Sequence, residues 1–506
     1  MNAKVIKNRI PKILAYSATS FVFLIVSAFL VLQIPAIQKK LVERYLRGFS
    51  EITGFRATIN DFQLLWFDRL ELKNLEVFDL ENNRMIAVKS MRVNFELSQL
   101  LDHNDVNLDA VYLDSADVFI TRIHESDTSR NLNINIFVDR INEQYGGNGA
   151  GTGRSPRINI GEAIVHESAF EYVDQDRDSI KTGFNYNQFA IGIEEAELRN
   201  FLALGDTIQF KVQTMLAADK HSDFKIDELS TFFRISQQSL EFIGLNLKVG
   251  ESVVSDTVLF TFNGQQELRD FNEKVDVHAN LRNTIIYPED LALFAPEART
   301  LSMPFTVNGS FNGRISNFKL TNMELTTGHT VLKGSLDMEG LPVLGETFTI
   351  LDLKNSTLDF EDLKGIVAPA ALARFTPLGK VRMNGEFLGY FTDFVATGSF
   401  NGDLGEIKSD INFKVNEEDF NRSVYSGKIA LNNFDLGKYL QDTANFQLVT
   451  LDGNVKGSGL TVQTADFKLV GKVDLFGFKN YNYTNINTNA RFASEFFNGF
   501  FSIDDP

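Results

Sequence analysis

The chain has 506 residues and a formal net charge of −17, with 49 Lys and Arg against 66 Asp and Glu. This negative charge argues against nucleic-acid binding, which needs clustered basic residues to neutralise phosphates. It also disfavours electrostatic binding of the main body to anionic lipids. There is no cysteine, which excludes disulfides, thiolate catalysis and zinc sites of the cysteine type. Phenylalanine is abundant, with 46 residues, and proline is scarce, with 10, which favours strands.

The first segment predicts a membrane anchor. Residues 13–34 form a run of 22 without a charge, which at about 1.5 Å per residue can cross a hydrocarbon core of about 30 Å. A cleaved signal peptide is the alternative, but its apolar region usually runs only about 7–15 residues, and the sequence before Pro35 is a poor cleavage site. We therefore expect a retained transmembrane signal anchor, with the tail of residues 1–12 inside and the body outside, although basic residues flank both ends.

A short amphipathic helix is expected after the anchor, within residues 35–57. Pro35 ends or kinks the span, and Ile37, Leu41, Tyr45 and Phe49 recur every four residues. One interpretation places this helix near the membrane surface, with basic residues on its other positions. The other interpretation is an ordinary helix packed on the first strands, and both stay open at this point.

From residue 58 onward, apolar and polar residues alternate with a period of two, which predicts strands with one apolar and one wet face. Val381, Met383 and Phe387, for example, alternate with Arg382 and Glu386. Turn-like connections join the strands and no long crossover helix is visible, so we expect a long antiparallel sheet. Helical patterns are few and short, and fall at residues 134–145, 288–298, 363–374 and 436–440.

The chain carries an internal repeat of about 72 residues. Its first element is an Asp-Leu pair, which begins at Asp290, Asp362 and Asp435, 72 and 73 residues apart. Its second element is a strand patterned apolar-x-Gly-x-apolar-x-Gly, with the glycine pairs Gly309 and Gly313, Gly385 and Gly389, and Gly453 and Gly457. We expect the aspartates to cap short helices and the repeated units to stack in a quasi-linear arrangement.

A second, shorter internal sequence similarity precedes this repeat. Residues 110–116 and 163–169 have similar sequences, lie 53 residues apart and each enter a strand. Between them, the run from Gly146 to Gly153 is rich in glycine, but no lysine follows it as a phosphate-binding loop requires. We interpret residues 146–156 as a flexible linker.

No constellation of residues in the sequence indicates catalysis. The six histidines are scattered, and adjacent glutamates at 194–195 and 417–418 fit a solvated surface better than a pair of catalytic acids. Asp174, Asp176 and Asp178 alternate like part of a calcium loop, but the glycine and distal glutamate of an EF-hand are missing. We predict no enzymatic activity, no cofactor and no metal site, and favour a structural, binding or conduit role.

A sheet with one apolar face must cover that face. Pattern alone favours a sandwich or filled solenoid, in which a second layer supplies the cover. The anchor and the glycines on the apolar side of the strands favour a sheet curled into a trough, whose interior is filled by acyl chains. The candidate groove residues are Phe305, Val307, Phe311, Val381, Met383, Phe387, Val449, Leu451, Val455, Phe467, Leu469, Val473 and Leu475.

The order of elements matches that of a known family. The shared features are the anchor, the segment Leu41-Val42-x-x-Tyr45-Leu46, the run Leu70-x-Leu72-x-Asn74-Leu75-x-Val77-x-Asp79, and the glycine-punctuated strands that continue to Phe501. Together they resemble the AsmA-like and TamB-type proteins of diderm bacteria, and most closely the N-terminal region of a Bacteroidota-type TamB. The likeness covers essentially the whole chain and rests on periodic patterns, without a diagnostic motif.

The resemblance implies a mainly β fold, in which an N-terminal transmembrane helix precedes a long, curled antiparallel β-sheet trough, or β-taco, with a few short helices. It also implies a single-pass anchor in the inner membrane and a body in the periplasm. The expected segments are the cytoplasmic tail (1–12), the anchor (13–34), a juxtamembrane helix (35–57), β-groove segments (58–145 and 157–285) joined by the linker (146–156), and repeated β-groove units (286–506).

The implied function is transport of phospholipid from the inner to the outer membrane, with acyl chains along the groove. One alternative is a scaffold that captures strands of nascent outer-membrane proteins or autotransporters by β-augmentation, beside a BamA- or TamA-like outer-membrane barrel. A purely structural envelope tether with a filled core is another. Because the chain ends at Pro506 directly after strand-like residues, we expect contact with a barrel to need a C-terminal region absent from this sequence.

Overall fold

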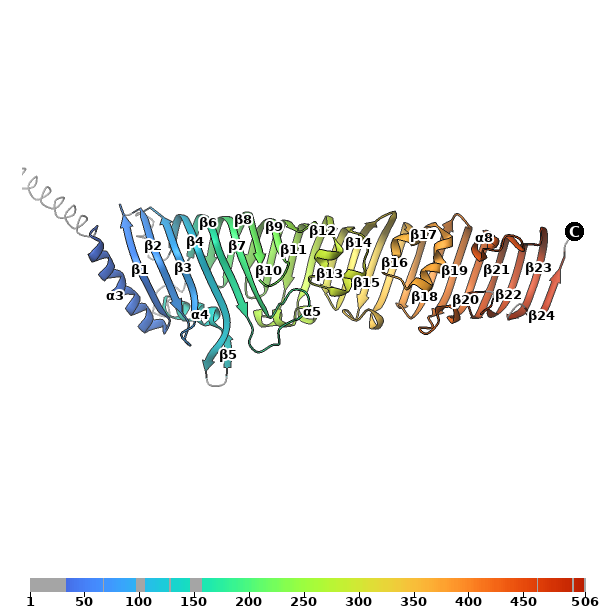
Figure 1. Cartoon of the computed structure of the whole chain (residues 1–506), viewed down its shortest axis with the longest axis horizontal. Helices are drawn as coiled ribbons and strands as arrows, with labels where there is room; N and C mark the ends of the chain where they lie inside the picture. The colour runs from blue at the N-terminus through green and yellow to red at the C-terminus, as the bar shows by residue number, and fades with distance from the viewer. Residues whose placement is uncertain are drawn as a thin grey trace, which may run out of the picture. The chain divides into compact units, whose positions relative to one another are not determined.

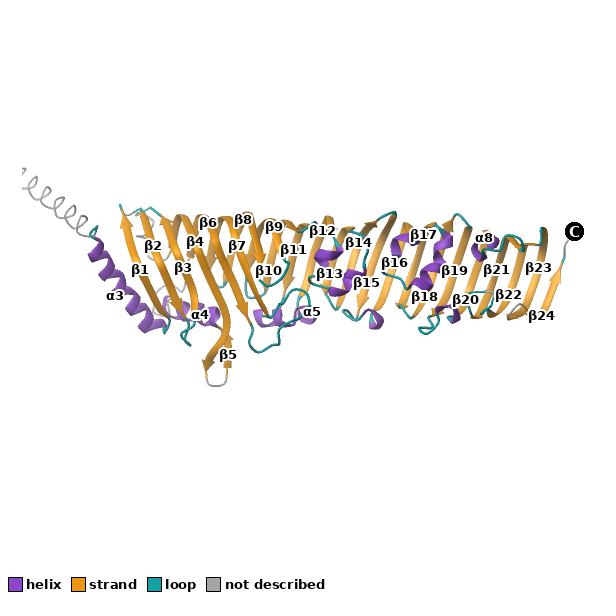
Figure 2. Ribbon diagram, viewed as in Figure 1, coloured by secondary structure: helices purple, strands orange, loops and turns teal. Residues whose placement is uncertain are grey.

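The computed structural model describes residues 33–66, 68–96, 105–126, 129–145, 157–461, 463–493 and 496–504. The chain divides into two compact units, Met1–Ser236 and Gln237–Pro506. Strands make up most of both units and the described helices are few (Figure 1 and Figure 2). The prediction of a mainly β, predominantly antiparallel protein is confirmed.

Three predicted segments fall wholly or almost wholly outside the described residues: the tail (1–12), the anchor (13–34, except its last two residues) and the linker (146–156). Among the described residues, no helix is both long enough and apolar enough to span a bilayer. The helix expected within 35–57 is present as α3, Pro35–Thr53. It begins at a proline and ends at Gly54, whose left-handed φ of 79° is typical of a helix C-terminus.

The sheet of the first unit contains strands β1 to β9. Their bounds are β1 Arg56–Leu65, β2 Arg69–Phe78, β3 Arg84–Asn94, β4 Asp105–Ser126, β5 Ser129–Leu132, β6 Arg157–Val173, β7 Gln188–Leu204, β8 Thr207–Asp219 and β9 Lys225–Ile235. Chain neighbours pair antiparallel from β1 to β4 and from β6 to β9, and β5 pairs with the end of β4. Phe55, Met85, Ile123 and Ile136 form a buried cluster beside α3 and the helix α4, Asn133–Tyr145.

One pairing in the first unit is parallel. In β4 and β6, Val111 lies opposite Ala163 and Asp117 lies opposite Ala169. The two echoing sequence segments are therefore neighbours in the sheet, and the connection between them contains β5 and α4. The expectation of a sheet without a crossover helix is wrong here, because two parallel strands need a long connection and α4 is part of it.

The sheet of the second unit contains strands β10 to β24. Their bounds are β10 Ser239–Val249, β11 Ser252–Thr261, β12 Asp276–Ile286, β13 Phe305–Arg314, β14 Asn317–Thr327, β15 Thr330–Glu339, β16 Phe348–Asp359, β17 Lys380–Tyr390, β18 Asp393–Gly402, β19 Gly405–Lys414, β20 Val424–Asp435, β21 Phe446–Ser458, β22 Asp466–Phe478, β23 Tyr481–Ala493 and β24 Phe496–Ile503. Each strand pairs antiparallel with the next. No pairing between described residues joins β10 to β24, so this sheet is open.

The sequence repeat corresponds to four strands of the second unit. A helical segment precedes every fourth strand, before β13, β17 and β21. These segments are α6 (Pro288–Leu291) and the 3₁₀ turn η3 (Pro296–Thr300), then η5 (Phe360–Leu363), α7 (Pro369–Phe375) and η6 (Thr376–Leu378), then α8 (Leu436–Leu440). Other short segments are η2 (Gln265–Asp270), α5 (Phe271–Lys274), η4 (Leu344–Glu346) and η7 (Phe420–Arg422). The predicted helical positions are confirmed, with the second and third split by non-helical residues.

The repeated aspartates do not all cap helices. Asp435 does so, because its Oδ1 accepts a hydrogen bond of 3.0 Å from the Lys438 N–H at the start of α8. Asp362 instead reaches back to the turn between β14 and β15. Its Oδ2 accepts the N–H groups of His329 and Thr330 and the Thr330 hydroxyl, each at 2.8 Å.

Asp290 has the same role as Asp362 one repeat earlier. Its Oδ2 accepts the Glu251 N–H at 3.1 Å, the Ser252 N–H at 2.9 Å and the Ser252 hydroxyl at 2.7 Å, in the turn between β10 and β11. The prediction of a helix cap is therefore wrong for two of the three aspartates. The helical turns at these two positions have only four residues each, and the hairpin turns offer donors that must be satisfied.

Asn308 and Asn384, which precede the first glycine of the repeated strand, each accept a hydrogen bond from a β-bulge in the preceding strand. Asn283 in β12 and Asn355 in β16 have left-handed φ values of 51° and 50°, and the pairing register shifts beside them. Their N–H groups donate hydrogen bonds of 2.7 Å to the Oδ1 atoms of Asn308 and Asn384. In the third repeat, the hydroxyl of Thr450 accepts a hydrogen bond of 3.0 Å from the N–H of Asn433.

Candidate functional site

The pairing register of the second unit aligns uncharged residues in four rows of seven across β17 to β23, on the side of the sheet that we call the apolar face. The first row is Met383, Phe400, Ile407, Leu431, Leu451, Val473 and Ile486; the second is Gly385, Gly398, Ser409, Ile429, Gly453, Gly471 and Thr488; the third is Phe387, Ala396, Ile411, Gly427, Val455, Leu469 and Ala490; the fourth is Gly389, Phe394, Phe413, Tyr425, Gly457, Phe467 and Phe492. None of these positions carries a formal charge.

The opposite side of the same strands is polar. On each strand, one residue separates the members of the second and third rows, and its side chain points to the opposite side of the sheet. These residues are also aligned across the strands: Glu386, Thr397, Asp410, Lys428, Asn454, Val470 and Asn489. The period-two alternation therefore separates charge from hydrocarbon across the thickness of the sheet.

Close backbone approach explains the glycines of the second row. A Cβ on Gly398 would lie 2.7 Å from the Cα of Gly385, and a Cβ on Gly471 would lie 2.5 Å from the Cα of Gly453. In the fourth row, a Cβ on Gly389 would lie 2.9 Å from the Cα of Phe394 on the next strand. No side chain fits at these positions without a shift of backbone.

Most side chains on the apolar face are half-buried rather than fully buried. Aromatic rings follow one another across the strands, with centroids 4.6 Å apart for Phe387 and Phe394 and 5.4 Å apart for Phe394 and Phe413. Among the large side chains of the rows, Val473 and Ile486 are buried, with exposed fractions of 7% and 1%. Large apolar side chains thus retain accessible surface along the rows, which a fully packed second layer would remove.

Short helical segments cover part of this face. Leu436 and Tyr439 of α8 pack with Val449, Val473 and Ile486 in one apolar cluster. A second cover comes from the segments around α7 and η7. The ring of Phe420 lies 5.9 Å from Phe413 and 6.3 Å from Phe375.

The hydroxyl of Tyr425 is the most acidic group on the four rows, and it stays protonated. Burial, with smaller contributions from Asp466 and Tyr439, raises the pKa of Tyr425 to about 12. Its hydroxyl donates a hydrogen bond of 3.0 Å to the carbonyl of Gly459. The apolar face therefore remains uncharged at neutral pH.

The structure brings together nearly all the predicted groove residues. Met383, Phe387, Leu451, Val455, Phe467, Leu469 and Val473 lie in the rows, Val449 packs with Val473, and Phe305, Val307 and Phe311 of β13 share a cluster with Met383. Val381 precedes Met383 by two residues and is buried. Leu475 differs, because a register shift places it opposite Thr450, and Phe476 joins the apolar cluster instead.

The prediction omitted several members of the face. These are Phe394, Phe400, Ile407, Phe413, Leu431, Phe476 and Ile486. Their strands also alternate, as in Phe394, Ala396, Gly398 and Phe400, so the period-two signal could have found all but Phe476. The bulge before Phe476 breaks that period.

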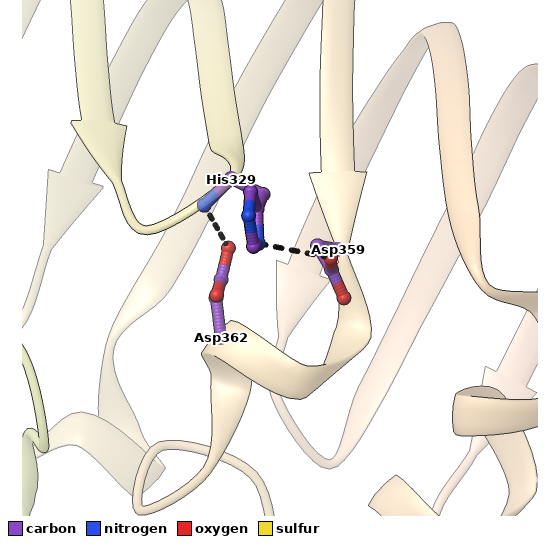
Figure 3. A group of neighbouring side chains, drawn as sticks. All are labelled: His329, Asp359 and Asp362. Carbon is purple, nitrogen blue, oxygen red and sulfur yellow. Dashed lines mark hydrogen bonds and ion pairs between the residues drawn. The ribbon is translucent and has the colours of Figure 1, made fainter.

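Within the described part of the chain, one group of side chains has ligand atoms close enough for a metal: His329, Asp359 and Asp362, whose ligand atoms lie within 4.8 Å of one another (Figure 3). His329 is exposed, and its Nδ1 lies 3.5 Å from Asp359 Oδ2. The Asp362 Oδ2 already accepts three hydrogen bonds, and Asp290 makes the same bonds where Glu251 replaces the histidine. The hydrogen bonds to the turn between β14 and β15 therefore account for the position of the Asp362 carboxylate without a metal ion.

Two of the three calcium-like aspartates of the first unit, Asp174 and Asp176, form ion pairs. Asp174 is 3% exposed, and its Oδ2 lies 3.5 Å from Arg122 Nε. Asp176 pairs with Arg130, and the Arg130 guanidinium also donates to the Arg122 carbonyl at 2.9 Å. Two guanidinium groups therefore neutralise the carboxylates that a cation would need.

Comparison of this chain with known protein families, with curated proteins and with solved structures finds no match.

Proposed function

We propose that the apolar face of the second unit binds the acyl chains of phospholipids, and that the protein is a lipid conduit between the inner and outer membranes of a diderm envelope. The observation that carries this proposal is the set of four uncharged rows whose large side chains keep accessible surface. In the proposal the sheet curls along its glycine row, so that acyl chains lie against the apolar face and headgroups remain in water.

The energetics favour hydrocarbon as the ligand. Each methylene group removed from water contributes about 0.8 kcal/mol, so a long alkyl chain gains affinity without any specific polar contact. The rows offer no charged partner for a headgroup, which fits a ligand recognised by its tails. An apolar cavity of about 210 Å³, lined by residues that include Leu301, Met303, Phe305, Leu325 and Ile366, extends this surface near β13.

The wider assignment depends on two sequence predictions: the anchor of residues 13–34 and the resemblance to AsmA-like and TamB-type proteins. It assigns the anchor to the inner membrane and the body to the periplasm, with no catalytic role and no nucleic-acid partner. A BamA- or TamA-like outer-membrane barrel is the partner that the resemblance implies.

Adjacent residues on β22 provide a matched test. Leu469 lies on the apolar face, and Val470 points to the polar side and is 40% exposed. With a photo-crosslinking residue on a neighbouring strand, Leu469→Asp is expected to abolish phospholipid crosslinking and Val470→Asp to leave it unchanged. Met383→Asp, Phe387→Asp and Leu451→Asp should behave like Leu469→Asp, while circular dichroism confirms that each variant is folded.

Native mass spectrometry of the detergent-purified chain provides the independent readout, with co-purified phospholipid expected in the parent and in Val470→Asp. Crosslinking that survives every charge on the apolar face rejects the conduit. Loss of function through proline substitutions at strand edges, with crosslinking unaffected by the interior charges, would favour the scaffold for outer-membrane proteins. Absence of bound lipid from the parent protein would favour the structural tether.

A further inference from the structure

The helix α3 of the first unit has one face that is fixed to the sheet. The side-chain amide of Gln38 donates a hydrogen bond of 3.0 Å to the Leu64 carbonyl and accepts one of 3.0 Å from the Leu64 N–H. Gln38 therefore satisfies the edge of β1 as a neighbouring strand would. On the same side of the helix, Phe49 packs on Phe137 with ring centroids 6.2 Å apart, and Thr53 is buried.

A stripe of α3 beside this packed face is apolar and exposed. Ile34, Leu41, Tyr45 and Ile52 have exposed fractions of 45%, 64%, 65% and 49%. Their spacing of seven, four and seven residues places them in one stripe along the helix. Gln38 lies three residues before Leu41 and seven before Tyr45, so the stripe adjoins the packed face of the helix. The four side chains nevertheless stay exposed, so packing on β1 does not explain why they are large and apolar.

The chemistry beside the stripe fits a lipid surface. Helix α3 carries Lys39, Lys40, Arg44 and Arg47 against Glu43 and Glu51, a net charge of 4 − 2 = +2 in a chain whose total is −17. Basic residues beside an apolar stripe are typical of helices that lie in the interface of an anionic bilayer. The stripe also begins at Ile34, the last residue of the uncharged stretch predicted to enter the membrane.

We infer that α3 lies in the plane of the membrane interface, with Leu41 and Tyr45 inserted at the boundary of headgroups and acyl chains. The adjoining face holds β1 through Gln38, so the helix fixes the first strand of the sheet against the bilayer. The two interpretations left open by the sequence then describe two faces of one helix. The inference goes beyond the proposed function, because it requires no lipid on the second unit.

The absence of cysteine allows a direct test with the full chain. Single substitutions Leu41→Cys, Tyr45→Cys and Glu43→Cys, each labelled with an environment-sensitive fluorophore, are reconstituted in vesicles that contain anionic phospholipid and a lipid with a nitroxide high on its acyl chain. Glu43 is exposed on the same helix, away from the stripe, and serves as the matched control. Quenching at Leu41 and Tyr45 should exceed that at Glu43 by about twofold or more, since only the stripe is buried about 5–10 Å into the interface.

A further arm separates this inference from lipid binding by the second unit. Quenching at Leu41→Cys should persist when Leu469→Asp is added, and should fall when the anionic lipid is replaced by a zwitterionic one. Equal quenching at all three positions, or none at Leu41 and Tyr45, overturns the inference. Loss of quenching in the Leu469→Asp background would also overturn it, because the signal would then come from lipid held elsewhere.

Discussion

The two units build apolar faces of the same kind, but they differ in where glycines lie on those faces. In the first unit, a row of facing residues crosses seven strands without a glycine: Leu64, Leu70, Val93, Val111, Ala163, Leu198 and Val212. Its long strands β4 and β6, of 22 and 17 residues, contain residues other than glycine with left-handed φ, such as Ser115 at 51° and Glu167 at 46°.

In the second unit, the strands are shorter and glycines occupy the centre of the apolar face. β17 to β20 have 10 to 12 residues, and Gly398 faces Gly385 across the pairing. The second unit also has left-handed residues other than glycine, such as Asn283 and Asn355, so the glycine pairs are an additional feature of its face. A glycine pair lets two backbones approach closely, because neither residue has a side chain. The second unit should therefore tolerate fewer substitutions at its centre than the first.

The largest expected effect tests this contrast with one chemical change in each unit. Gly398→Ala should destabilise the second unit by about 2–4 kcal/mol, since the added methyl group overlaps backbone and strains the local conformation. Gly192→Ala, in β7 of the first unit, should change stability by less than about 0.5 kcal/mol, because its nearest neighbour atom would be 3.6 Å away. Hydrogen exchange measured by mass spectrometry assigns each effect to its unit, and equal effects would contradict the contrast.

A smaller effect is expected from the turn contacts that distinguish the repeats of the second unit. Asp362→Ala leaves three donors without their acceptor and should cost about 2–3 kcal/mol, whereas Asp435→Ala removes one helix cap and should cost about 1 kcal/mol. His329→Ala is the control, with an expected change below about 0.5 kcal/mol for an exposed ion pair. Denaturant unfolding measures all three, and an equal cost for the two aspartates would refute the assigned roles.

The edge of the first unit provides a third comparison. Gln38→Ala should cost about 1–2 kcal/mol, because both the N–H and the carbonyl of Leu64 lose their partner. The N–H of Leu64 should then exchange with solvent faster, while Glu43→Ala on the exposed side of α3 should leave it unchanged. Exchange at Leu64 that does not respond to Gln38→Ala would show that α3 does not protect this edge.

The smallest effect concerns pH and the cap of α8. The hydrogen bond from the Lys438 N–H, with a smaller contribution from the Lys438 side chain, lowers the pKa of Asp435 below its usual value of 3.8. A lowered folded-state pKa gives a stabilisation that is present above about pH 4 and lost as the pH falls through the folded-state value. The parent should therefore lose more stability than Asp435→Asn between pH 5 and pH 3, by thermal melting, and identical losses would contradict the cap.

Alternation in the sequence was sufficient to predict the strands and one apolar face. Met383, Phe387, Leu451 and Val473 were found from period two alone, because side chains in a strand point to alternate sides regardless of its neighbours. Leu475 was misassigned, since a bulge shifts the period by one residue and depends on the partner strand.

The parallel pairing was hidden for a different reason. The echo at residues 110–116 and 163–169 was visible, but similar sequences do not state whether they pair or in which direction. Only the path of the chain through α4 fixes β4 beside β6 in the parallel sense. The repeated Asp-Leu pair likewise revealed the length of the repeat but not the role of each aspartate. Asp435 caps a helix and Asp362 contacts a turn, because different N–H groups lie beside the two carboxylates in the folded chain.

The sequence by itself determined the mainly β composition, the repeat of about 72 residues and the uncharged character of one side of each strand, because these are local consequences of residue type and spacing. The tertiary structure decided which residues share a row, where glycine permits backbone contact, and which side of α3 packs on β1. Those features depend on register between strands, and a one-residue shift reverses every side chain without changing the local pattern.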